Sequence, residues 1–155
     1  MRIRHALIPA LALLAGCAGP QGQLTSLAEE RLSLAPDIAW YKHSRDIPVY
    51  DPQRETAILE TVMAAGQLQG LDPATVRRFF AAEMEASRRI QWAWIHAWRK
   101  NRAVPPDRPA HDLGAYVRPQ IDEINSRQLN ALARGAQPLT VNQLSAIGAR
   151  FLPKN

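Results

Sequence analysis

The chain has 155 residues, of which 46% are hydrophobic and 21% are charged, and its formal net charge at pH 7 is +5. It is long enough for one ordinary domain and apolar enough to bury a core, which excludes a disordered or low-complexity protein. The single cysteine, Cys17, excludes an intrachain disulfide framework, a zinc site built from cysteines and a CxxC redox pair.

Residues 1–16 have the features of a lipoprotein signal peptide. Basic residues precede an apolar run, residues 6–15, that is too short to span a bilayer as a helix. The run ends in Leu-Ala-Gly directly before Cys17, which resembles the lipobox cut during bacterial lipoprotein processing. We therefore expect acylation of Cys17 after cleavage. An ordinary cleaved signal with an incidental cysteine is the alternative.

The residue after Cys17 is Ala18, so no acidic retention signal stands there. By resemblance to processed lipoproteins, the protein would be exported to the periplasm and anchored to the outer membrane only through lipidated Cys17. Cleavage removes two arginines and lowers the net charge, and an exported protein has little access to nucleic acid. We therefore expect no nucleic-acid partner.

The remaining chain is predicted to be all-α. Residues 17–23 hold the cysteine and then glycine and proline without an apolar period, which predicts a short flexible tether. Residues 24–155 form the domain, in which the hydrophobic periods are helical and no stretch has the alternation of a strand. Proline is expected to kink the first helix at Pro36, and two Asp-Pro pairs and Thr140 are start signals for later helices. The predicted helices cover about residues 24–46, 52–69, 73–100, 113–135 and 140–151.

The third and longest helix carries polar residues where a core stripe should be apolar. Its stripe passes from Val76 and Phe80 to Glu83, Ser87 and Gln91 before it becomes apolar again. Burying such groups without partners would cost about 1–3 kcal/mol each, so something polar must face them. Glu83 itself could orient an arginine or simply be exposed.

Four cations on the other helices border apolar stripes. Arg31 and Lys42 are about three helical turns apart and share a face, Arg54 shares a face with apolar neighbours, and Arg127 lies one turn beyond Ile124. Each could be a solvated side chain at the edge of a stripe. Together they would suit a small ligand with two or more carboxylates, because guanidinium groups hold carboxylates in a fixed orientation.

The sequence lacks other catalytic machinery. None of its histidines forms a ligand pair at helical spacing, and it has neither a glycine-rich phosphate loop nor a Gly-x-Ser-x-Gly elbow. We expect no metal and no cofactor, and a reaction that needs only positioning and electrostatics.

Six residues resemble, in order and spacing, the active-site series of the all-helical AroQ chorismate mutases. Residues 28–32 (AEERL), 40–42 (WYK), 51–55 (DPQRE) and 86–91 (ASRRIQ) carry the resemblance, and residues 121–127 are similar to the fourth helix of the secreted gamma subclass. That subclass supplies its last arginine from the same chain, and an export signal fits it. The six residues are Arg31, Lys42, Asp51, Arg54, Ser87 and Gln91.

The resemblance implies an AroQ-type bundle with one long central helix, and the isomerase activity of the aromatic amino acid (shikimate) pathway that converts chorismate to prephenate. Its substrate-binding set would be the six residues and Arg127, with Arg31, Arg54 and Arg127 as the clamp on the substrate carboxylates. Lys42 and Gln91 would donate hydrogen bonds to the ether oxygen, and these two with Arg54 are the expected catalytic residues. A homodimer with each pocket inside one chain is also implied.

Two questions stay open at this point, the role of Asp51 and the choice of function, and one expectation concerns pH. Asp51 could contact the substrate or act only as an N-cap. Gln91 donates a hydrogen bond at any pH, so activity from mildly acidic to mildly alkaline pH is expected. The alternative functions are an isochorismate-pyruvate lyase on the same fold, and a non-catalytic helical lipoprotein that binds an acidic ligand or a partner protein.

Overall fold

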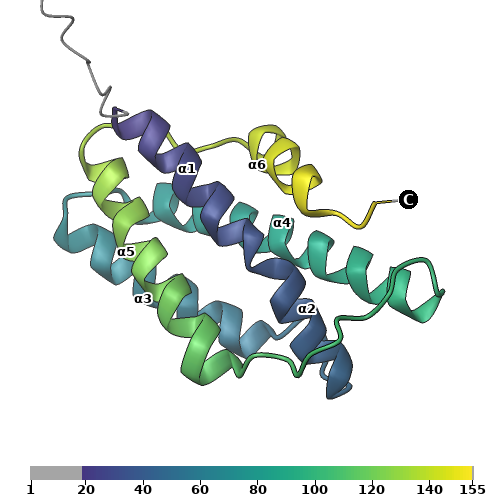
Figure 1. Ribbon diagram of the computed structural model, residues 1–155. Coiled ribbons are helices and arrows are strands. Elements are labelled where there is room, and N and C mark those ends of the chain that lie inside the picture. Colours follow the sequence, from purple (N-terminus) through teal and green to yellow (C-terminus); the bar gives the residue numbers. More distant parts are fainter. Residues whose placement is uncertain (1–18, 155) are drawn as a thin grey trace, which may run out of the picture.

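The computed structural model describes residues 19–154, which form a bundle of helices without a strand (Figure 1). The all-α prediction is confirmed, and each of the five predicted helical segments is present. The signal peptide and Cys17 lie outside the described residues. The elements are α1 (Pro20–Ser33), α2 (Ala35–Ser44), α3 (Pro52–Leu68), α4 (Pro73–Arg99), a π-helical turn η1 (Leu113–Val117), α5 (Arg118–Ala133), α6 (Val141–Gly148) and a 3-10 turn η2 (Ala149–Phe151).

The predicted capping residues start the helices. The side chain of Asp51 accepts a hydrogen bond from the backbone N–H of Arg54 at 3.0 Å, and Asp72 does the same for Thr75 at 2.9 Å. In each case the carboxylate satisfies an N–H group that the first turn of a helix leaves without a partner. Thr140 forms a reciprocal capping box with the side chain of Gln143 at the start of α6.

The first predicted helix is divided by its proline. Helix α1 ends at Ser33, and α2 begins at Ala35 with Pro36 in its first turn, where a missing N–H group costs nothing. This division gives the bundle one more helix than the sequence predicted.

The predicted tether is wrong for residues 20–23, which form the first turn of α1. Pro20 begins the helix, and the side-chain amide of Gln21 forms two hydrogen bonds with the backbone of Gln137. Gln21 donates to the carbonyl oxygen of Gln137 at 3.2 Å and accepts from its N–H at 2.8 Å. The partner lies more than a hundred positions away, so the local sequence pattern could not show this contact.

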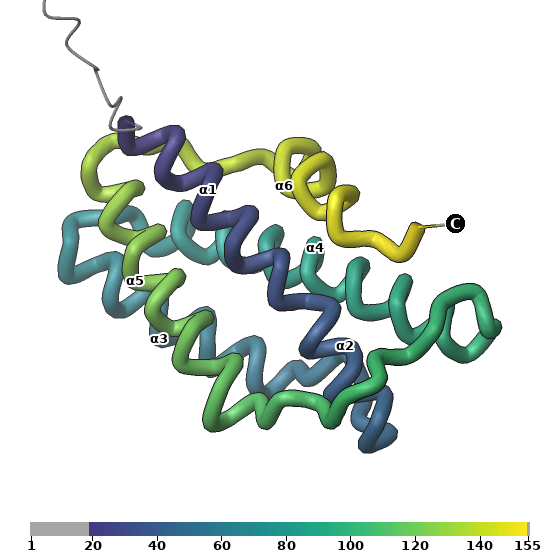
Figure 2. The backbone as a smooth tube through the Cα atoms, in the orientation of Figure 1, coloured from purple at the N-terminus to yellow at the C-terminus, as the bar shows by residue number. Residues whose placement is uncertain are grey.

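Helix α4 runs through the middle of the bundle and packs against α2, α3 and α6, while α1 packs against α5 (Figures 1 and 2). Phe79 and Phe80 of α4, Leu24 of α1 and Leu144 of α6 are fully buried at these contacts. Gly66 lets α3 approach closely, because a Cβ at this position would lie 2.9 Å from the Val76 side chain. The apolar core thus follows α4 along its length and includes Met84 and Ile90 from its middle.

The connection between α4 and α5 fixes where α5 begins. Figure 2 shows this segment, residues 100–112, returning from the end of α4 past α2 to the start of α5. Trp40 of α2 holds it by donating its indole N–H to the carbonyl oxygen of Arg108 at 3.0 Å. The start of α5 therefore lies near α2, across from the polar middle of α4.

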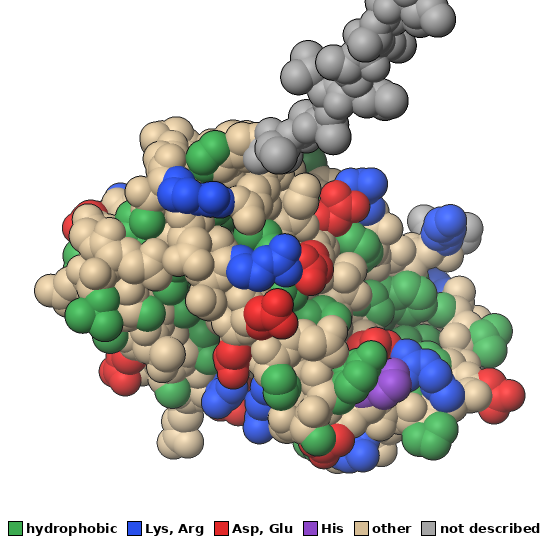
Figure 3. All heavy atoms as spheres, turned by 60° about the vertical axis from the view of Figure 1, so that its left-hand side comes forward, with side chains coloured by type: hydrophobic (Ala, Val, Ile, Leu, Met, Phe, Trp, Pro, Cys, Tyr) green, Lys and Arg blue, Asp and Glu red, His purple; other side chains and the backbone are tan. Residues whose placement is uncertain are grey.

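The surface has mixed charge. On the face shown in Figure 3, basic and acidic side chains lie next to one another and do not separate into areas of one sign. None of the helices in the part of the chain that the structure describes is both long enough and apolar enough to cross a membrane.

Candidate active site

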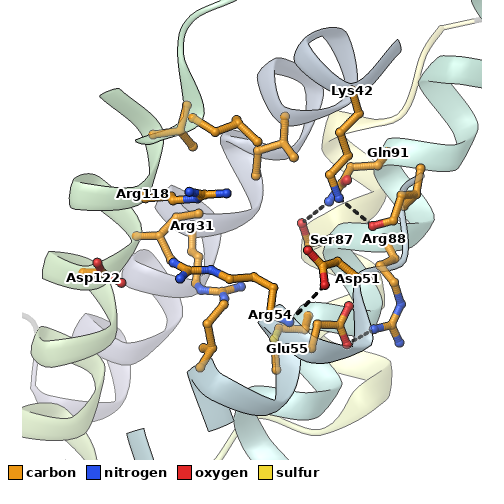
Figure 4. Close-up of a pocket in the computed structure, with 17 residues that line it drawn as sticks. Arg31, Lys42, Asp51, Arg54, Glu55, Ser87, Arg88, Gln91, Arg118 and Asp122 are labelled. Atoms are coloured by element: carbon orange, nitrogen blue, oxygen red, sulfur yellow. Dashed lines mark hydrogen bonds and ion pairs between the residues drawn. The ribbon is translucent and has the colours of Figure 1, made fainter. Parts of the chain in front are cut away.

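A cavity opens among α1, α2, α3, α4 and the start of α5 (Figure 4). Six of the seven predicted substrate-binding residues line it, and Arg127 does not. The lining residues are Arg31, Ile38, Lys42, Val49, Asp51, Arg54, Glu55, Ile58, Met84, Ser87, Arg88, Gln91, Leu113, Val117, Arg118, Ile121 and Asp122.

The polar middle of α4 forms part of this cavity, as its sequence indicated. Ser87 and Gln91 are buried, and the Gln91 amide donates to the Ser87 hydroxyl at 3.1 Å. An amide nitrogen carries two hydrogens, so the second N–H of Gln91 can serve a ligand. We call Arg31, Ser87 and Gln91 the floor of the cavity.

Polar side chains of α4 and α5 hold the guanidinium group of Arg31. It is 5% exposed, its Nε donates to Oδ1 of Asn125 at 3.0 Å, and Nε lies 3.3 Å from Oε2 of Glu83. Gln128 in turn donates to Oε1 of Glu83 at 2.6 Å. Burial raises the pKa of the Glu83 carboxyl, and Arg31 and Gln128 oppose that rise. Of the two possibilities for Glu83, exposure is wrong, and contact with an arginine is what the structure has.

Lys42 reaches the cavity from α2. Its Nζ donates to the carbonyl oxygen of Val49 at 2.5 Å, and the remaining two hydrogens of an ammonium group are available to a ligand. Burial lowers the pKa of Lys42, while the nearby carboxylates of Asp51 and Glu55 act in the opposite direction. The ammonium group is therefore partly desolvated and lies near compensating negative charge.

Asp51 caps α3 and also lines the cavity. The N-cap role is thus present, and it is compatible with a second contact, because a carboxylate has more than one acceptor site. By capping α3 it fixes the backbone of Arg54, whose long side chain extends along the cavity (Figure 4).

Arg127 does not reach the cavity. It is 45% exposed and lies 3.5 Å from Glu30 on the outer side of α1 and α5. Arg118, which sequence reasoning missed, lines the cavity in its place. The two arginines are nine positions apart, so at about 100° per residue they point to opposite faces of α5. Arg118 stands one turn before Ile121, and this spacing was the available signal.

Three arginines consequently meet at one side of the cavity. Figure 4 shows Arg31, Arg54 and Arg118 on this side and Lys42 and Gln91 on the other. Arg54 and Arg118 are exposed, and we call them the rim of the cavity.

A fourth arginine lines the cavity but is already paired. Arg88 forms ion pairs with Glu55 and Glu85, and its guanidinium carbon lies 5.1 Å from the centre of the Tyr50 ring. Sequence reasoning missed this cluster, although Glu85 and Arg88 have the i, i+3 spacing of a helical ion pair. With Arg88 neutralised, the charge left for a ligand comes from the floor and rim arginines and from Lys42.

The cavity fits an anion rather than a metal ion. Within residues 19–154 no three His, Cys, Asp or Glu side chains are grouped closely enough to bind a metal. The converging side chains are hydrogen-bond donors, three of them planar guanidinium groups that match carboxylates. The arrangement can hold a small dicarboxylate and donate further hydrogen bonds to an oxygen between its ends.

The sequence profile of the family described as chorismate mutase type II matches residues 22–92. Among curated proteins, the chain is similar to the monofunctional chorismate mutase of Enterobacter agglomerans, with 31% identity over 115 residues, 73% of this chain and 61% of the relative. It is also similar to the secreted chorismate mutase of Mycobacterium tuberculosis, with 31% identity over 110 residues, 71% of this chain and 54% of the relative. The chain thus matches less than two thirds of the length of these curated relatives.

Solved structures include similar proteins. The crystal structure of a chorismate mutase from Burkholderia thailandensis has a TM-score of 0.70 and 37% identity, covering 74% of this chain and 72% of that one. The secreted chorismate mutase from Yersinia pestis has a TM-score of 0.70 at 24% identity, covering 84% and 95% of the two chains, which is a likeness of fold.

Proposed function

Because this chain belongs to the type II chorismate mutase family, we propose that its cavity binds chorismate and catalyses the rearrangement to prephenate. The convergence of Arg31, Arg54 and Arg118 opposite Lys42 and Gln91 is the observation that carries this proposal. It supplies fixed positive charge for two carboxylates and donors for the oxygen between them.

The three arginines act as the carboxylate clamp. A flexible diacid must adopt a compact, chair-like conformer before its new carbon–carbon bond can form, and holding both carboxylates selects that conformer. Arg31 provides the fixed contact because it is buried and anchored, whereas Arg54 and Arg118 close on the ligand from the rim. Arg118 takes the role that the sequence had assigned to Arg127.

Lys42 and Gln91 stabilise the transition state. As the ether C–O bond breaks, negative charge grows on its oxygen, and donors already aimed at that position stabilise the charge without reorganisation. Both side chains have hydrogens left after their contacts with Val49 and Ser87. The reaction is unimolecular, so these residues need not transfer a proton or form a covalent bond.

Ser87 and Asp51 support the two groups beside them. Ser87 orients the Gln91 amide, and Asp51 holds the first turn of α3, which carries Arg54. Either side chain can also contact the ring hydroxyl of the substrate.

We also propose that the protein is exported, anchored through lipidated Cys17 and dimeric, with each pocket inside one chain. Relatives described as secreted chorismate mutases support export, and the presence of Arg31, Arg54 and Arg118 around one cavity of the same chain supports a pocket inside one chain. Mass spectrometry of the membrane fraction tests the acyl chains, and sedimentation tests the dimer. An unmodified Cys17 or a monomer would contradict the corresponding part.

The activity is tested by following the loss of chorismate absorbance with purified residues 18–155 and identifying the product. We expect prephenate from the wild type, a loss of at least about a hundredfold in Lys42→Ala, and no change in Lys100→Ala, which alters an exposed lysine outside the cavity. Folded protein without turnover would contradict the proposal. Release of pyruvate from isochorismate would then identify the lyase, and inactivity on both substrates would favour a non-catalytic binding protein.

A further inference from the structure

Arg31 differs from the other two arginines of the clamp in how it is held. It is almost completely buried, whereas Arg54 and Arg118 are exposed. A buried guanidinium group loses its hydration and needs partners that replace it. The partners of Arg31 meet its Nε, and among the described residues none is hydrogen-bonded or ion-paired to its two outer nitrogens, while the side chain lines the cavity.

The partners form a second layer behind the cavity wall. Glu83 and Gln128 are fully buried, and neither lines the cavity. Glu83 comes from α4, while Gln128 and Asn125 lie one turn apart on α5, so the layer joins three helices through Arg31. Among the described residues, Arg31 is the only cation within ion-pair distance of Glu83, and Oε2 of Glu83 has no hydrogen bond.

Packing alone does not require a carboxylate at the position of Glu83. A fully buried carboxylate costs free energy, and an apolar side chain of similar volume at this position of α4 would continue the stripe of Val76 and Phe80. The carboxylate instead lies behind Arg31, one of three guanidinium groups that gather around one cavity and repel one another. It supplies negative charge within ion-pair distance of the most buried of them, while Asn125 accepts the hydrogen bond from the same Nε.

We propose that Glu83, supported by Gln128, is a positioning residue for the reaction: it fixes Arg31 through Nε so that the outer nitrogens meet a substrate carboxylate. The inference rests on the proposed function. It assigns a role to a side chain that the active-site series does not include and that does not itself touch the substrate.

A double-mutant cycle tests this coupling. Wild type, Glu83→Met, Arg31→Ala and the double variant are compared in kcat and KM for chorismate. We expect Glu83→Met to raise KM about tenfold, because the loosened arginine binds the carboxylate less well. In the Arg31→Ala background the same substitution should change kcat/KM by less than about twofold. A merely structural role would reduce the amount of active enzyme, and so lower kcat, with KM unchanged.

A conservative variant and a matched control complete the experiment. Glu83→Gln keeps the shape and an oxygen that can accept the hydrogen bond from Gln128 but removes the charge, and should restore part of the affinity lost in Glu83→Met. Glu30→Gln, an exposed acid on the same helix as Arg31, should leave both constants unchanged. If Glu83→Met does not fold, Gln128→Met is used in the same cycle, with a smaller rise in KM expected.

The outcomes separate the two proposals. A wild type that turns over chorismate supports the proposed function whatever the variants do. Wild-type KM in Glu83→Met, or an equal loss with and without Arg31, overturns the positioning role alone. An inactive wild type overturns the proposed function, and the positioning role with it.

Discussion

The floor of the cavity is buried and hydrogen-bonded, whereas the rim is exposed. The floor residues emerge from α1 and α4 next to core residues of the same helices, Leu32, Met84 and Ile90, so their geometry is set by the same packing that holds the bundle together. The rim residues stand at the starts of α3 and α5, and their side chains are exposed. The difference teaches that stability and activity should be coupled at the floor and separable at the rim.

The largest expected effect is that of Arg31→Ala on both properties. The substitution removes a clamp residue and leaves the Glu83 carboxylate buried without its cation. We expect about 3 kcal/mol or more of lost stability, and a loss of at least about a hundredfold in kcat/KM. Denaturant unfolding and chorismate turnover measure the two. Normal stability in an inactive variant would break the proposed coupling at the floor.

Gln91→Glu should lower activity strongly, but only above the pH at which the new carboxyl ionises. A protonated Glu can donate a hydrogen bond to the ether oxygen, and a carboxylate cannot. At alkaline pH the loss in kcat should reach about a hundredfold, the effect of removing one such donor. The wild type should keep its activity from mildly acidic to mildly alkaline pH. A steep wild-type loss between about pH 6 and 8 would argue against Gln91 as the donor.

Arg118→Ala should separate the two properties. We expect a loss of about 2 kcal/mol in transition-state stabilisation, about thirtyfold in kcat/KM, from one missing charged contact. The free energy of unfolding should change by less than about 0.5 kcal/mol, because the side chain is exposed. Arg127→Ala is the matched control on the opposite face of α5. If Arg127→Ala loses activity and Arg118→Ala does not, the geometry of the rim given above is wrong.

The smallest effect is a pH dependence of stability that belongs to the floor. Burial raises the pKa of Glu83 against the opposing effects of Arg31 and Gln128, so the folded protein holds this proton more tightly than the unfolded chain. The stabilisation is present below the ordinary pKa of 4.5 and is lost as pH rises through the folded value. Relative to Glu83→Gln, the wild type should therefore lose stability as pH increases.

Denaturant unfolding of the wild type and of Glu83→Gln, at pH values from below 4.5 upward, measures this difference in stability. Asp122→Asn, which changes an acid at the exposed edge of the cavity, serves as the control and should follow the wild type. A wild type that gains stability relative to Glu83→Gln as pH rises would mean that Arg31 outweighs burial.

The sequence predicted those parts of the fold that depend on neighbouring residues. Asp51-Pro52 and Asp72-Pro73 start α3 and α4. After α3 the chain turns at Gly70, whose φ of 77° is in the left-handed region that glycine favours. The polar gap in α4 likewise located the cavity, because a stripe that faces a core shows its exceptions in the sequence.

What the sequence missed depends on long-range packing. Arg118 and Arg127 have equivalent positions beside apolar residues, and the choice between them depends on which face of α5 turns to α4. The segment that leads into α5 is held by the contact of Trp40 with Arg108, which lies 68 positions away in the sequence and has no local signature. The first turn of α1 also lacks a local signature, because the two hydrogen bonds between Gln21 and the distant Gln137 stabilise it.

The early start of α1 determines how close to a bilayer the enzyme would work. Only two residues separate Cys17 from Pro20, and three extended peptide links reach about 10 Å. With the acyl chains proposed at Cys17, the helical domain would lie against the lipid headgroups, because no long flexible linker would separate it from the membrane. The local concentration of its dianionic substrate would then follow the surface potential of the membrane, and turnover on vesicles should decrease as their content of anionic lipid increases.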